Sequence, residues 1–248
     1  MRKWKKCIWI ALGIGFMAVL TVIAVMIGKS FVSPSATVWK EWKPALHKGE
    51  SIIDGVKEGA SAYLIISRKG RRDYGDLLVV LEQKGSRWER VYENDFEELH
   101  PWKIEAADVD GDGTQELLTA VNKTAHYDPV LKNRLFVFNY ENGILTKKWT
   151  GSAFTGEWID FHVGDLLPIP GSEVIFTEQA GGKKEKLSIY YWFDFGFVKL
   201  AESDSYKDII ALTIMKENLL KVTYDKKYKR TAFLTVLDGK IVETASEE

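Results

Sequence analysis

Residues 104–121 read IEAADVDGDGTQELLTAV, and this stretch decides the expected fold. Two runs of residues that favour β-strands, 104–107 and 116–121, enclose a loop rich in aspartate and glycine. A second stretch, FHVGDLLPIPGSEVIFTE at residues 161–178, aligns with the first. Asp108 then matches Asp165, and Glu116 matches Glu173. The chain therefore repeats one strand–loop–strand unit.

Short runs of β-forming residues continue from about residue 52 to the end of the chain, with few helical stretches. A strand–turn–strand unit follows each aligned stretch, and similar units occur before and after. Their turn glycines are Gly85, Gly143, Gly196 and Gly239. Asn142-Gly143 and Asp238-Gly239 are favoured two-residue hairpin turns. Repeats of this length are typical of propeller blades, so the sequence predicts an all-β, propeller-like repeat domain of about four blades over residues 51–248.

Three aspartates alternate in the loop between the first two runs. They are Asp108, Asp110 and Asp112, with Gly111 and Gly113 supplying the unusual backbone angles of a tight turn. Ca²⁺ prefers six to eight oxygen ligands, which such a turn can present on alternate side chains. A surface turn rich in Asp and Gly is the alternative. Calcium is favoured because carboxylates this close repel one another without a cation.

Flanked by strands, the loop resembles the calcium loop of FG-GAP and VCBS-type repeats, which build the propellers of integrin α-chains and many bacterial surface proteins. The resemblance is sharp over residues 102–121, fair over 159–176 and only architectural elsewhere. It implies Ca²⁺ held by the side chains of Asp108, Asp110 and Asp112, a backbone carbonyl at Thr114, and Glu116.

Two related sites are excluded. An EF-hand needs a bidentate glutamate at the twelfth loop position, where this chain has Thr119, and it needs flanking helices. The second copy of the loop has Leu167 and Ile169 in place of the middle acids. We therefore expect no metal there, only a turn held by packing and hydrogen bonds.

The N-terminal region predicts a membrane anchor. Residues 8–27 carry no charge, four basic residues precede them, and Lys29 follows. We expect a cytosolic basic tail (1–7), a transmembrane signal-anchor (8–28), a stalk (29–50) and an extracytoplasmic domain at the plasma membrane. A cleaved secretory signal is the alternative. Trp39 and Trp42 are either interfacial anchors or part of a first strand.

Composition narrows the class of protein. The net charge is −1, but residues 1–29 carry +5 and no acid, so the remainder is at −6, which disfavours nucleic acid as a partner. Cys7 is the one cysteine, so the outer domain has no disulfide, as is common on Gram-positive cell surfaces. The sequence contains no HExxH pair, GxSxG elbow or phosphate-binding loop. The sequence therefore predicts that the protein is not an enzyme. His162 is expected to be a packed or edge histidine.

Residues 122–134 are predicted to be a long loop between two strands. It is the candidate partner-binding loop because it offers groups for hydrogen bonding and stacking: His126, Tyr127, Asp128, Lys132 and Arg134. A solvated connection is an equal alternative. The tryptophans could stack on sugars, but Trp149, Trp158 and Trp192 recur at strand positions and are expected in the core.

The sequence thus predicts a membrane-anchored, calcium-stabilised repeat domain that acts as a binding or scaffold module for a protein or glycan partner at the cell envelope. The alternatives are an envelope hydrolase or lyase on a propeller scaffold, and an accessory subunit of a membrane complex.

Overall fold

The structure, a computed structural model, describes residues 42–68, 70, 73–151, 154, 156–215 and 218–245. The predicted cytosolic tail, the membrane segment and most of the stalk lie outside the described residues, together with Cys7 and Trp39. The chain divides into two compact units, Met1–Pro44 and Ala45–Glu248, and the second is described below. Within the described ranges, no helix is long and apolar enough to cross a membrane.

The second unit is built from four meanders, each of four antiparallel strands. Meander 1 contains β1 (Ser51–Glu58), β2 (Ser61–Ser67), β3 (Leu77–Lys84) and β4 (Arg87–Asp95). Meander 2 contains β5 (Pro101–Ala107), β6 (Glu116–Ala125), β7 (Asp128–Glu141) and β8 (Ile144–Thr150). Meander 3 contains β9 (Trp158–Gly164), β10 (Glu173–Gly181), β11 (Lys184–Phe193) and β12 (Gly196–Ser203). Meander 4 contains β14 (Ile209–Ile214), β15 (Leu219–Tyr224), β16 (Arg230–Leu237) and β17 (Lys240–Thr244).

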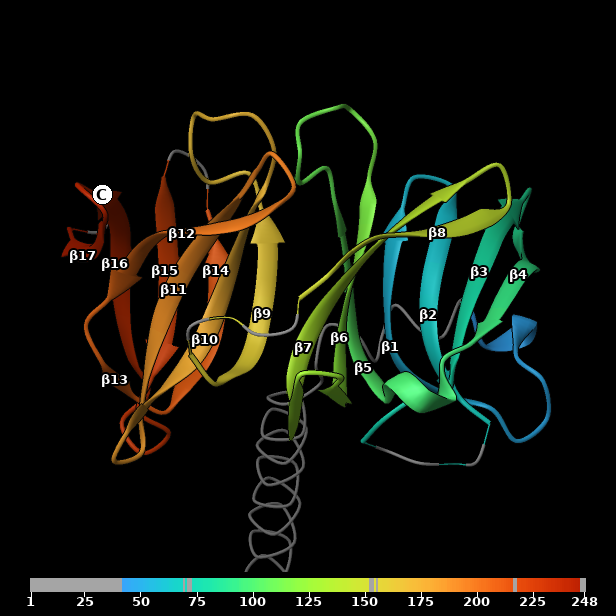
Figure 1. Cartoon of the computed structure of the whole chain (residues 1–248), viewed down its shortest axis with the longest axis horizontal. Helices are drawn as coiled ribbons and strands as arrows, with labels where there is room; N and C mark the ends of the chain where they lie inside the picture. Colours follow the sequence, from blue (N-terminus) through green and yellow to red (C-terminus); the bar gives the residue numbers. More distant parts are fainter. Residues whose placement is uncertain are drawn as a thin grey trace, which may run out of the picture. The chain divides into compact units, whose positions relative to one another are not determined.

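Within each meander the strands are hydrogen-bonded in chain order. Meanders 1 and 2 are separate sheets, whereas meanders 3 and 4 are joined because β12 pairs in parallel with β17. The short strand β13 (Tyr206–Lys207) pairs with β11, and two 3₁₀ helices are described, η1 (Lys43–Ala45) and η2 (Glu97–Leu99). Figure 1 shows the meanders side by side in chain order, with the first and last at opposite ends of this unit. The prediction of an all-β domain is confirmed.

The hairpin turns follow the predicted chemistry with one exception. Asn142 and Gly143 have φ of 51° and 77°, and Asp238 and Gly239 have φ of 49° and 75°, so both predicted two-residue turns are confirmed. The turn predicted at Gly196 lies just before it, because β11 ends at Phe193 and β12 begins at Gly196. Asp194 has the positive φ there, at 55°.

The core lies between neighbouring meanders, because successive residues of a strand point to opposite faces of its sheet. Leu117 of β6 is buried with Ile65 and Leu78 of meander 1, whereas Leu118 is buried with Phe161 and Phe176 of meander 3. In the same way, Val174 of β10 packs toward meander 2 and Ile175 toward meander 4. Strands buried on both faces account for the continuous apolar runs in the sequence.

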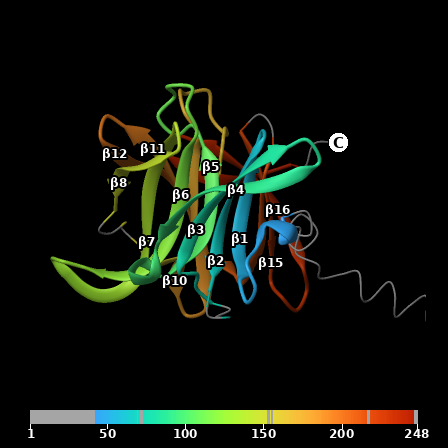
Figure 2. The same cartoon turned by 90° about the vertical axis from the view of Figure 1, so that its right-hand side faces the viewer.

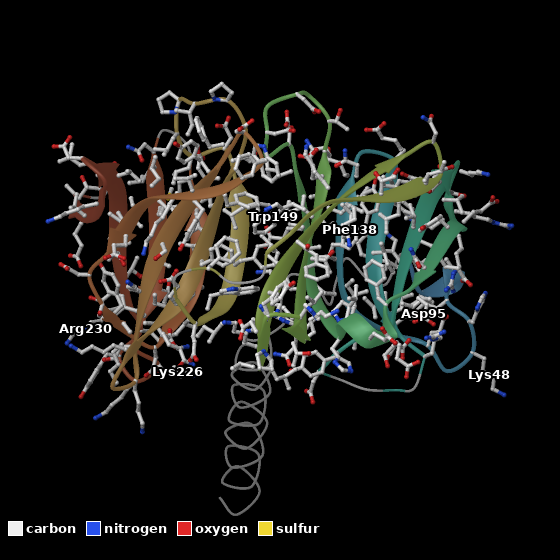
Figure 3. The ribbon with its side chains drawn as sticks, in the orientation of Figure 1. Lys48, Asp95, Phe138, Trp149, Lys226 and Arg230 are labelled. Carbon is white, nitrogen blue, oxygen red and sulfur yellow. The ribbon has the colours of Figure 1, made fainter. Side chains whose placement is uncertain are left out.

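Tryptophans take part in this core to different degrees. Trp158 is buried, as predicted, while Trp149 and Trp192 are partly buried and pack against the same cluster. Trp149 contacts the ring of Phe197 in meander 3, with ring centroids 5.2 Å apart, and Phe138 packs with meander 1 residues. Figure 3 shows these two side chains of meander 2 on opposite sides of its sheet.

Candidate functional site

The acidic loop joins the end of β5 to the start of β6, at one end of the strands of the domain (Figure 1). Asp108 organises it by accepting hydrogen bonds from three backbone N–H groups of the loop. Oδ1 accepts from Gly111 at 2.7 Å and from Asp112 at 3.2 Å, and Oδ2 accepts from Gly113 at 2.8 Å. Gly111 and Gly113 have positive φ, as the sequence predicts for this turn. The loop is therefore folded back on the first of its aspartates.

Three of the five predicted calcium ligands come together. Asp108, Asp110 and Glu116 each offer a carboxylate oxygen, and these oxygens lie within 4.8 Å of one another. Asp112 is not part of this group; its Oδ1 accepts a hydrogen bond from the N–H of Thr114 at 2.7 Å.

Glu116 anchors the group to the sheet. Its side chain is fully buried, and Oε2 accepts from the N–H of Val109 at 3.0 Å. Burial raises the pKa of this carboxyl.

A lysine far from the loop in the sequence reaches the same group. Lys148 of β8 donates to Asp110, and it donates to Oε1 of Glu116 at 2.8 Å. Its ammonium also lies 5.5 Å from the ring of Trp192. Lys148 therefore offsets part of the carboxylate repulsion that favoured a metal ion in the sequence-based prediction.

The three carboxylates still fit a divalent cation, because one oxygen of the group has no partner among the described residues. Within that part of the chain, Oδ1 of Asp110 is buried without a hydrogen bond, and an unpaired buried carboxylate oxygen is costly. Ca²⁺ prefers oxygen ligands of this kind, and Asp108, Asp110 and Glu116 would hold it there. The ion would supply positive charge to the loop and would compete with the ammonium of Lys148 for Asp110 and Glu116.

The second loop copy packs directly against the first. Ser172 N–H donates to the carbonyl of Asp108 at 2.7 Å, and a Cβ added at Gly111 would lie 2.9 Å from Cβ of Pro170. Glu173 occupies the place that Glu116 has in the first copy. Its Oε2 accepts from Leu166 N–H at 2.9 Å and Leu167 N–H at 3.3 Å. Hydrogen bonds and packing thus hold this turn of meander 3 against the acidic loop of meander 2.

The predicted partner-binding loop is not a loop. Residues 122–133 extend the hairpin of β6 and β7, with His126 and Tyr127 at its two-residue turn and Ala125 paired with Asp128. We call this extension the arm; Figure 2 shows it projecting from the sheet. The length between the two apolar runs, which suggested a loop, is accounted for by strand residues beyond the pairing with β5 and β8.

The five predicted partner-binding residues have different surroundings. Tyr127 is 95% exposed at the tip, with the His126 ring 4.5 Å from its own. Asp128 is paired with Lys132 at 2.6 Å and with Arg134 at 3.2 Å. Hydrogen bonds from these two cations hold the pKa of Asp128 below its usual range.

Arg134 is buried and cannot face a partner. Nε donates to the carbonyl of Lys123 at 2.8 Å, and Nη2 donates to the carbonyls of Asp128 and Val130, each at 3.1 Å. These bonds connect the two strands of the arm. Arg134 therefore fixes the shape of the arm from inside it.

A charged cluster that was not predicted from the sequence lies on the first strands of meanders 1, 2 and 3. Lys103 and Glu105 of β5 meet Asp160 and His162 of β9. The Lys103 ammonium lies 2.8 Å from Asp160 and 3.1 Å from Glu105, and the His162 ring nitrogens lie 3.3 Å from Glu105 and 3.5 Å from Asp160. Asp54 of β1 accepts from the N–H of Ile104 at 2.9 Å. We call these five residues the inner-strand cluster.

The cluster ties the backbones of adjacent meanders together. Oε2 of Glu105 accepts from Val163 N–H at 2.9 Å, and the Lys103 ammonium donates to the carbonyl of Phe161. The alternating positions 103/105 and 160/162, aligned between the two repeats, are the one signal in the sequence that could have revealed it. His162 is thus a half-buried, ion-paired residue in its strand.

The surroundings shift the pKa values of this cluster in opposite directions. Burial raises the pKa of Asp54 to about 6. Burial opposes charge on Asp160 and His162 too, but their mutual contact and their other partners outweigh it. The pKa of Asp160 falls to about 2 and that of His162 rises to about 9.

Because the pKa of His162 is higher in the folded state, its contribution to stability is complete below its unfolded pKa, near 6.5, and is lost as the pH rises through about 9. We expect the free energy of unfolding to fall by about 1–2 kcal/mol across this window. His162→Gln should remove that fall. Urea unfolding at both ends of the window measures it, and the exposed His126→Gln is the control. An equal fall in His162→Gln would contradict the assignment.

Comparison with known proteins gives information on the fold only. No protein-family model and no curated protein matches the chain. A crystal structure from Bacteroides uniformis, assigned as a 6-phosphogluconolactonase, matches with 12% identity and a TM-score of 0.54 over 79% of this chain and 54% of that chain. The chain thus spans about half the length of that protein. This likeness shows the fold alone and supports a β-propeller-like arrangement.

Two further structures match less well. A protein from Bacteroides fragilis, also assigned as a 6-phosphogluconolactonase, has 10% identity and a TM-score of 0.40, covering 76% of this chain and 67% of that one. A Xanthomonas protein related to a type IV secretion system has 14% identity and a TM-score of 0.33, covering 82% of this chain and 96% of that one.

The prediction that the protein is not an enzyme is contradicted. The Bacteroides uniformis structure, which shares this fold, is itself assigned as a 6-phosphogluconolactonase, so the fold does not exclude enzyme activity. The physical reason for the error is that the prediction rested on missing sequence motifs. Side chains on different meanders can gather without any motif, as Glu105, Asp160 and His162 do here.

Proposed function

We propose that residues 45–248 form a calcium-stabilised, propeller-like recognition domain of the FG-GAP/VCBS type, with about four blades. In this proposal residues 8–28 anchor it in the plasma membrane of a Gram-positive cell, and the domain binds a protein or glycan partner at the cell envelope. One observation supports the proposal most strongly. Asp108, Asp110 and Glu116 converge at the loop where meander 2 meets the matching loop of meander 3.

A cation at this place would act on two meanders at once. The acidic loop packs on Pro170 and Gly171 and accepts a hydrogen bond from Ser172, so fixing the loop also fixes its neighbour. Binding energy that is available only to the folded state stabilises that state. The role we propose for Ca²⁺ is therefore to hold the scaffold that presents the binding surface.

Calcium titration by isothermal calorimetry tests the proposal. We expect the purified protein to bind one Ca²⁺. Asp110→Asn should weaken binding at least about tenfold because it removes a charged ligand. Lys148→Met should tighten binding by about tenfold because the competing ammonium is gone. Asp165→Asn, in the aligned loop without the middle acids, is the matched control and should bind as the wild type does.

Lys148→Met and Asp110→Asn give the calcium titration two outcomes that would contradict the proposal. If neither the wild type nor Lys148→Met binds Ca²⁺, the proposed calcium site is wrong. Binding that is lost equally in Asp110→Asn and Asp165→Asn would place the ion elsewhere.

A further inference from the structure

A groove of 320 Å³ lies at the base of the arm. The arm forms one wall, and the start of β9 and the end of β10 form the other. Its volume is within the range of small-molecule sites, at the small end. Residues that line it include Asn122, Leu131, Lys132, Asn133, Glu157 and Gln179.

A second hollow of 380 Å³ continues from the groove. The two share Asn133 and Ile159, and the second adds the indole of Trp102 and the phenol of Tyr74. Asn133 therefore lies where both hollows meet. A ligand longer than one small ring could occupy both and would contact Asn133 near its middle.

The amide of Asn133 is held in a fixed orientation. Its Oδ1 accepts from Nδ2 of Asn122 at 3.0 Å, and its Nδ2 donates to the carbonyl of Trp158 at 2.9 Å. The next residue, Arg134, ties the strands of the arm together from inside. Because an amide has two donor hydrogens and two acceptor lone pairs, Asn133 keeps one of each for a ligand.

The charges of the groove do not favour an anionic ligand. Its one cation, Lys132, is paired with Asp128 at 2.6 Å, and the carboxylate of Glu157 lies on the opposite wall. Phosphate recognition depends on uncompensated Arg or Lys groups. Three amides, a carboxylate and a paired ammonium instead match hydroxyl groups, each of which can both donate and accept.

We propose that this groove binds a neutral oligosaccharide, with Asn133 and Gln179 hydrogen-bonding its hydroxyls and Leu131, Ile159 and the indole of Trp102 against the faces of its rings. The inference rests on the proposed recognition function and names the class of its ligand. The groove is also separate from the acidic loop. Along β6, Asn122 in the groove follows Glu116 of the acidic loop by six residues, roughly 20 Å at 3.3 Å per residue.

The test is binding of the full-length protein in mild detergent to an array of neutral oligosaccharides and of sulfated, phosphorylated and uronic-acid oligosaccharides. We expect retention of neutral oligosaccharides, measured again in solution by calorimetry for the best one. Asn133→Ala and Gln179→Ala should each weaken that binding about tenfold, the loss expected for one or two hydrogen bonds. Gln83→Ala, at another exposed strand end, is the matched control.

Gln179 keeps the test valid if Asn133→Ala disturbs the arm, because its exposed side chain makes no hydrogen bond among the described residues. Binding of acidic oligosaccharides alone, no binding at all, or binding unchanged in both variants would overturn the proposal. The array is repeated with EGTA and with Asp110→Asn. If the protein binds oligosaccharides but not Ca²⁺, the groove proposal stands and the calcium site is wrong. If it binds Ca²⁺ but no oligosaccharide, only the groove proposal is wrong.

Discussion

Gly171→Ala is expected to lower the free energy of unfolding by about 3–4 kcal/mol, which is about 10 °C in melting temperature for a domain of this size. Gly171 lies in the second loop copy with φ of 86°, a conformation that strains any residue with a Cβ. An added Cβ would also lie 2.4 Å from the carbonyl oxygen of Val109 in the first copy. Neither backbone can move without separating the two loops, so the strain and the clash add.

Gly181→Ala separates these two causes. Gly181 has a similar φ of 80°, but nothing lies within 4 Å of its added Cβ, so this variant has the strain without the clash. We expect a loss of about 1 kcal/mol. Thermal and urea unfolding of both variants, in EGTA, measure the difference. Equal losses would mean that the two loops are not packed as described.

The repeat was the part of the fold most open to prediction. Asp108 and Asp165 align in the sequence, and the same is true of the buried Glu116 and Glu173, which accept N–H groups from the residues after those aspartates. A loop that closes on its own backbone leaves a local pattern in the sequence. The hairpin turns at Gly143 and Gly239 were predictable for the same reason, since positive φ selects particular residues at each turn.

Contacts between distant strands could not be predicted in this way. Lys148 reaches the acidic loop from β8, and nothing near it in the sequence marks it as a partner of Asp110. The arm was taken for a loop because strand residues beyond the sheet edge need no apolar alternation. Arg134 was expected to face a partner but is buried, because its hydrogen bonds to carbonyls compensate for the burial.

The inner-strand cluster supports the other large prediction. Lys103→Met should lower the free energy of unfolding by about 3 kcal/mol, because it leaves the two carboxylates of Glu105 and Asp160 with a single cationic partner, His162, in a partly buried place. It also removes the hydrogen bond to the carbonyl of Phe161, which connects β5 to β9. Urea unfolding near pH 7 measures the loss. Lys147→Met, an exposed lysine on β8, should change stability by less than about 0.5 kcal/mol.

A second substitution shows whether charge is the cause. If the loss comes from the excess negative charge, Asp160→Asn in the Lys103→Met background should restore about 1 kcal/mol, although Asp160→Asn alone destabilises the protein. If the loss comes from packing of the lysine side chain, the two losses add and nothing is restored. The coupling matters beyond stability because these residues lie on the first strands of meanders 2 and 3, and Ile159 and Trp102, beside Asp160 and Lys103, line the hollow next to the proposed oligosaccharide groove. A protein that loses this ion pair should therefore bind the oligosaccharide more weakly even where it remains folded.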